Sequence, residues 1–121
     1  MLDDTLPLTP PEWPEWGNPI ESATDYATIK AYAPYENIHA TDYPHILATG
    51  GLTDPRVTYW EPAKWIARLR ARRTDAGLSL LRTEMTAGHG GKAGRFNQLH
   101  EVAFVYAFVI FVHTVFREKQ Q

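Results

Sequence analysis

The chain has 121 residues, of which 44% are hydrophobic and 21% charged, a balance typical of one globular domain. Its formal net charge of −2 offers no strong positive field for phosphate groups, so we expect no nucleic-acid partner. The absence of cysteine excludes disulfides, thiol catalysis and thiolate metal sites. The first residues lack the basic and then apolar pattern of a secretion signal, and we therefore expect a cytoplasmic protein.

The first 20 residues are rich in proline and tryptophan. Five prolines lie between residues 6 and 19, together with Trp13 and Trp16. Because proline lacks a backbone donor and disfavours a regular helix, we expect an extended loop pinned by aromatic side chains. We therefore divide the chain into this Pro/Trp-rich loop, residues 1–20, and one structured region, residues 21–121.

Two short elements follow the loop. Residues 25–33 predict a helix that ends before Pro34, because the residue preceding a proline is pushed out of the helical conformation. Residues 44–50 predict a short buried strand that stops at Gly50 and Gly51.

The next helix has the clearest periodicity in the chain. Pro62, Trp65, Ile66 and Leu69 recur at i, i+3, i+4 and i+7, which predicts one packed face and one solvated face. Residues 78–83 then resume as a strand. A strand, a helix and a strand in this order predict a right-handed βαβ unit with parallel strands, so the fold class is α/β.

The last predicted helix runs from residue 95 to about residue 116 and is apolar on all sides between residues 102 and 112. A membrane span needs about 20 apolar residues, and this run ends earlier, before His113 and Arg117. We therefore expect no membrane partner, and a terminal helix that covers a sheet face with additional apolar surface for another contact.

Two loops carry the candidate chemistry, residues 51–57 after the first strand and residues 87–91 after the second. Loops at the carboxyl ends of parallel strands converge on one edge, so Asp54 and His89 are expected to meet. Their order along the chain is that of the acid and base in an α/β-hydrolase triad. The alternative is that Asp54 and Pro55 form a turn, and that the glycines around His89 form a flexible surface loop.

A nucleophile is missing from this pattern. No G-x-S-x-G elbow precedes Asp54, and neither Ser22 nor Ser79 lies in such an elbow. The five histidines also lack the H-E-x-x-H spacing of a zinc site, so we expect no metal and no other cofactor.

Five blocks of sequence together resemble the prolyl oligopeptidase family of serine peptidases, in particular its oligopeptidase B subfamily. The resemblance extends from the first residues to about Val109. The blocks are residues 15–19, 35–37, 42–45, 54–65 and 88–95.

The resemblance implies that the chain is the C-terminal part of an α/β-hydrolase fold, with parallel strands and flanking helices. It implies that Asp54 and His89 are the catalytic aspartate and histidine, and that Arg56 binds a carbonyl of the peptide substrate. The nucleophile, the oxyanion donors, the residues selecting Lys or Arg, and a β-propeller would belong to a missing N-terminal part, the expected partner of this chain. The isolated chain is then expected to be inactive.

A second hypothesis remains open. The chain would be a non-catalytic α/β interaction module that binds a protein partner through its bare sheet edge and its apolar helix.

Overall fold

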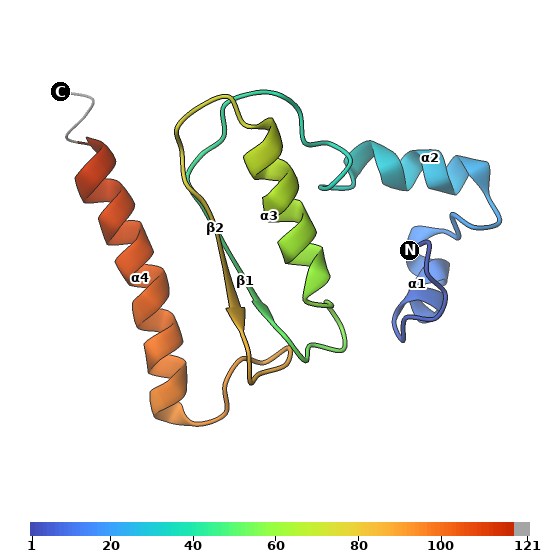
Figure 1. Cartoon of the computed structure of the whole chain (residues 1–121). Coiled ribbons are helices and arrows are strands. Elements are labelled where there is room, and N and C mark those ends of the chain that lie inside the picture. Colours follow the sequence, from blue (N-terminus) through green and yellow to red (C-terminus); the bar gives the residue numbers. More distant parts are fainter. Residues whose placement is uncertain (118–121) are drawn as a thin grey trace.

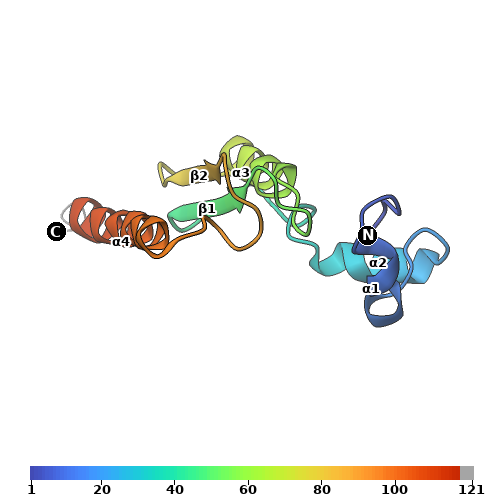
Figure 2. The ribbon, with the colours of Figure 1, turned by 90° about the horizontal axis from the view of Figure 1, so that it is seen from below.

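The structure is a computed structural model that describes residues 1–117 (Figure 1). The elements are α1 (Thr9–Trp16), α2 (Ala23–Tyr32), β1 (Ile46–Gly51), α3 (Trp60–Arg72), β2 (Ser79–Glu84) and α4 (Arg95–Arg117). β1 and β2 form a two-stranded sheet, with α3 on one side and α4 on the other (Figure 2). The predicted α/β class is confirmed. Residues 118–121, the end of the structured region expected from the sequence, lie outside the described residues.

The central unit is β1-α3-β2, as the sequence predicts. The strands pair in parallel, in a register that runs from Ile46 opposite Ser79 to Gly51 opposite Glu84. α3 places Ile66 and Leu69, which are 1% and 0% exposed, against the sheet, where they form the core together with Ile38. The i, i+3, i+4 pattern of α3 therefore marks the packed face correctly.

The N-terminal segment corrects one expectation. Residues 1–20 are not an extended loop throughout, because α1 is helical from Thr9 to Trp16. Pro10 and Pro11 lie in its first turn, where the backbone N–H groups have no intrahelical acceptor, so their missing donors cost the helix nothing. Only Pro14 lies in the interior, and the helix ends two residues later at Trp16.

α2 ends at Tyr32, two residues before Pro34, as predicted. Ser22 caps its beginning, with the side-chain oxygen accepting a hydrogen bond from the backbone N–H of Asp25 at 3.1 Å. The segment after α2 is attached to α3 by Tyr35, whose ring centroid lies 4.5 Å from the guanidinium carbon of Arg68.

α4 is a continuous helix whose outer face is bare. Large apolar side chains such as Phe96, Tyr106 and Ile110 are more than 60% exposed. The expectation that its apolar run is too short for a membrane span needs correction, since Arg95–Val115 is long and apolar enough by length and composition alone. The same helix contacts the sheet, where the Arg82 guanidinium lies 4.2 Å from the centroid of the Phe104 ring.

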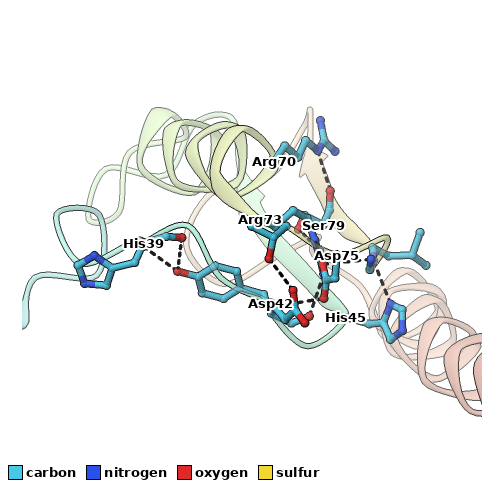
Figure 3. A network of polar contacts seen from close by, with 11 residues as sticks. His39, Asp42, His45, Arg70, Arg73, Asp75 and Ser79 are labelled. Carbon is cyan, nitrogen blue, oxygen red and sulfur yellow. Dashed lines mark hydrogen bonds and ion pairs between the residues drawn. The ribbon is translucent and has the colours of Figure 1, made fainter.

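A polar network joins the amino ends of the two strands (Figure 3). Arg73, with a side chain only 6% exposed, donates to the Asp75 carboxylate at 2.6 Å, to the carbonyl of Tyr43 at 2.8 Å and to the hydroxyl of Ser79. Asp75 in turn accepts from the backbone N–H of Tyr43 at 3.1 Å. The segments that lead into β1 and β2 are thereby held together at the end opposite the candidate chemistry.

Candidate active site

The two candidate loops leave the same edge of the sheet and touch each other. The backbone N–H of Leu52 donates to the carbonyl of Glu84 at 2.9 Å, and that of Thr53 donates to the carbonyl of Ala87 at 3.3 Å. A Cβ atom at Gly51 would lie 2.4 Å from the carbonyl oxygen of Ala87. The loops approach this closely because Gly51 has no side chain.

Asp54 and His89 meet where these loops converge. Oδ2 of Asp54 lies 3.0 Å from Nδ1 of His89, a hydrogen-bond distance between residues 35 apart in the chain. The Asp54 side chain is 7% exposed, whereas that of His89 is 49% exposed. The juxtaposition predicted from strand order is confirmed, with the carboxylate shielded and the imidazole open to solvent.

The loop around Asp54 keeps its carboxylate charged. Partial burial raises the pKa of Asp54, but hydrogen bonds from the backbone N–H groups of Val57 and Arg56 and from His89 outweigh it, so the pKa lies below its ordinary value. The two backbone groups donate to Oδ1 at 3.0 and 2.8 Å, which leaves Oδ2 for the imidazole. Pro55, which has no N–H to donate, lies within this turn without breaking it.

His89 is carried on a tight glycine turn. Gly88 and Gly91 form an antiparallel bridge, and the N–H of Gly91 donates to the carbonyl of Gly88 at 3.2 Å. Gly91 has φ = 75°, a conformation that glycine adopts without strain. Within residues 1–117 no hydrogen-bond partner contacts Nε2 of His89. That nitrogen is available to a substrate or to a group from outside these residues.

This arrangement pairs a shielded carboxylate with a solvent-exposed imidazole that can act as a base. An ionised carboxylate only accepts, so Nδ1 of His89 donates to Asp54, and in the neutral form of the ring Nε2 presents its lone pair as a base. Neither serine completes the site, because Ser79 is buried and bound to Arg73 and Ser22 caps α2. Across the described part of the chain, no cluster of three potential metal ligands is found. The pair lines a groove of about 1500 Å³.

Arg56 lies in the Asp54 loop, as the sequence indicates. Its backbone N–H binds Asp54, and the residue is exposed at the same edge of the sheet. Two residues that shape this edge, Glu84 and Lys92, were not predicted, and Gly51 was predicted only as the end of the strand. Glu84 and Lys92, which lie before and after His89 in the chain, form an ion pair with an N–O distance of 3.0 Å. Their opposite charges on either side of His89 were the sequence signal that could have predicted this pair.

Comparison with known proteins identifies the family of this chain. Residues 1–113 match the prolyl oligopeptidase family. The chain belongs to this family. Protease 2 of Moraxella lacunata is 54% identical over 110 residues, and dipeptidyl aminopeptidase BI of Pseudoxanthomonas mexicana is 51% identical over 110 residues. Each match covers 91% of the chain, but only 16% and 15% of the respective relative.

The structural comparison confirms the fold. Oligopeptidase B from Leishmania major superposes with a TM-score of 0.85 at 44% identity, over 88% of the chain and 15% of that structure. The fold is therefore part of an α/β-hydrolase catalytic domain, and the resemblance to oligopeptidase B noted in the sequence is confirmed.

Proposed function

We propose that this chain supplies the aspartate and histidine of a Ser-His-Asp peptidase site. The observation that carries the proposal is the 3.0 Å contact between Oδ2 of Asp54 and Nδ1 of His89. In the complete site, Nε2 of His89 takes the proton of a serine hydroxyl and later returns it to the leaving amine. Asp54 holds the imidazole in the required tautomer and stabilises the imidazolium. The serine and the oxyanion donors come from outside this chain.

The substrate in this proposal is a peptide, cleaved after Lys or Arg as the oligopeptidase B resemblance implies. Protease 2 and dipeptidyl aminopeptidase BI carry different names, yet they match the chain almost equally well. The shared segment therefore fits a role in the common chemistry, and selection of the side chain to be cleaved is assigned to other parts of the enzyme. Arg56 is proposed to bind a carbonyl of the peptide.

The partner in this proposal is the polypeptide that completes the catalytic domain. Within residues 1–117, β1 and β2 each have an unpaired edge, and the outer face of α4 is apolar and exposed. A two-stranded sheet has only marginal stability by itself, so further strands and helices are needed to cover the strand edges and the apolar face of α4. We expect the isolated chain to aggregate, and a monodisperse monomer with a sharp thermal transition would contradict this.

The test is a chimera in which the whole chain replaces the matching segment of Moraxella Protease 2. We expect the chimera to cleave a peptide ester after Lys or Arg, and His89→Ala to lower kcat by about 10³- to 10⁴-fold. His100→Ala, an exposed histidine on α4, is the matched control and should leave kcat unchanged.

Two outcomes would overturn the proposal. One is a folded, active chimera that keeps its turnover after His89→Ala. The other is hydrolysis above buffer by the isolated chain that His89→Ala abolishes, because the chain would then contain its own nucleophile.

A further inference from the structure

The turn that carries His89 is closed by an ion pair. Glu84 ends β2, and its Oε1 lies 3.0 Å from Nζ of Lys92, three residues beyond His89. The same oxygen accepts from the hydroxyl and the backbone N–H of Thr86 at 3.2 and 3.4 Å. Lys92 lowers the pKa of Glu84 more than partial burial raises it, and Thr86 adds to the lowering, so the carboxylate stays charged.

α4 holds the far end of the same turn. Oε1 of Glu101 accepts a hydrogen bond from the backbone N–H of Lys92 at 3.2 Å. Its other oxygen, Oε2, lies 2.6 Å from the position that a Cβ of Gly91 would occupy. The turn is therefore attached to the end of β2 through Glu84 and to the second turn of α4 through Glu101.

The turn needs such attachments because its backbone is unusually free. Gly88, Gly90, Gly91 and Gly94 lie within seven residues, and glycine loses more conformational freedom on ordering than any other residue. A Cβ at Gly90 would contact nothing within 4 Å, so packing does not restrain the tip. The backbone contacts with the Asp54 loop fix Ala87, but they stop before His89.

We propose that Glu84 and Lys92 are positioning residues that hold His89 against Asp54 by closing the ends of its turn. This inference rests on the proposed function for its effect on turnover. Without the pair, the turn samples conformations in which Nδ1 of His89 is displaced from Oδ2 of Asp54. Small displacements of a catalytic group lower the rate steeply, whereas substrate affinity depends on other contacts.

The first test compares Lys92→Met with Lys92→Arg in the Protease 2 chimera. Both substitutions retain the backbone N–H that binds Glu101, and only Arg keeps the charge. Because Lys92 is 37% exposed, we expect a modest effect, with kcat about three- to fivefold lower for Lys92→Met and KM unchanged. Lys92→Arg should restore kcat, and Lys30→Met on α2 is the control for the loss of a surface lysine.

Glu84→Gln should reduce kcat to a similar extent. Added to Lys92→Met, it should lower kcat little further, because both substitutions remove the same ion pair. A Lys92→Met chimera with unaltered kcat, or an equal loss in Lys30→Met, would overturn the positioning role.

Hydrogen exchange of the peptide that covers residues 85–91 separates this inference from the proposed function. We expect exchange about three- to fivefold faster in Lys92→Met than in Lys92→Arg. Equal exchange in the two variants would overturn the positioning role of Glu84 and Lys92 even in an active chimera. If the unsubstituted chimera is folded but inactive and the exchange difference between the two variants is still seen, the proposed function is overturned and the positioning role is supported.

Discussion

The two ends of the same pair of strands are built in opposite ways. At the amino end, Arg73, Asp75 and Ser79 join the incoming segments through side-chain hydrogen bonds, with the Arg73 side chain 6% exposed. At the carboxyl end, the outgoing loops touch mainly through backbone groups, and His89 is 49% exposed.

The two ends of the strands therefore have different tasks, since the amino end holds the strands in register and the carboxyl end carries Asp54 and His89. A buried side-chain network fixes the parallel register at one end, so the loops at the other end start from defined positions. Those loops are then free to use glycine, which permits close approach of the backbones and leaves the imidazole open to solvent. Asp54 and His89 meet because their strands are held in register some distance away.

The largest expected effect comes from closing the space between the two loops. In Gly51→Ala, the new Cβ would lie 2.4 Å from the carbonyl of Ala87 and 2.7 Å from that of Gly88, and neither backbone atom yields easily. We expect a loss of about 1–3 kcal/mol in the free energy of unfolding, measured by urea titration of the Protease 2 chimera. In the chimera, kcat should fall at least tenfold as His89 is pushed from Asp54.

The matched control is Gly90→Ala, at the tip of the His89 turn, where a Cβ has no neighbour within 4 Å and φ is not positive. Its free energy of unfolding should stay within about 0.5 kcal/mol of that of the unsubstituted chimera. Equal losses in the two variants would show that the close contact at Gly51 has no special role.

Local patterns predicted much of this fold. The spacing of Ile66 and Leu69 marked the packed face of α3, and the paired glycines at 50 and 51 marked the end of β1. The juxtaposition of Asp54 and His89 followed from topology, because parallel strands deliver their loops to one edge. Each of these inferences depends on backbone periodicity or strand order, which a sequence displays directly.

The parts that were missed depend on pairing between distant side chains. The contacts of Arg73 have no local signal, because only the fold shows that it reaches Tyr43 and Ser79. The helix α1 was missed because prolines were counted without regard to position, although Pro10 and Pro11 lie in its first turn. The exposed apolar face of α4 was not missed, since the sequence predicts surplus apolar surface on this helix.

A second prediction concerns the amino-end network in acid. The hydrogen bond from Arg73 lowers the pKa of Asp75 to about 2 against the opposing effect of burial, with further help from the N–H groups of Gly77 and Tyr43. Because the folded value lies below the unfolded one, the stabilisation is complete above about pH 4 and is lost as pH falls toward 2. Asp75→Asn should therefore flatten the decline in Tm of the Protease 2 chimera between pH 4 and 2.

Ser79→Ala is the control for this measurement. It removes a hydrogen-bond partner of Arg73 without removing a titratable group, so it should lower Tm at every pH and keep the slope between pH 4 and 2. An Asp75→Asn slope as steep as that of the unsubstituted chimera would mean that this carboxylate does not control acid unfolding.

The smallest expected effect lies at the rim of the same network. The hydroxyl of Thr74 donates to Oδ1 of Asp42, an exposed contact that joins the segments before β2 and β1. Thr74→Val keeps the shape and the backbone bond to Thr41 but loses this donor, so the free energy of unfolding should fall by about 0.5–1 kcal/mol. Thr28→Val, at an exposed position of α2, controls for the effect of replacing a threonine by valine. In the chimera kcat should not change, because the buried part of the network still sets the register of the two strands. A fall in kcat would show that the exposed contact between Thr74 and Asp42 also helps to set this register.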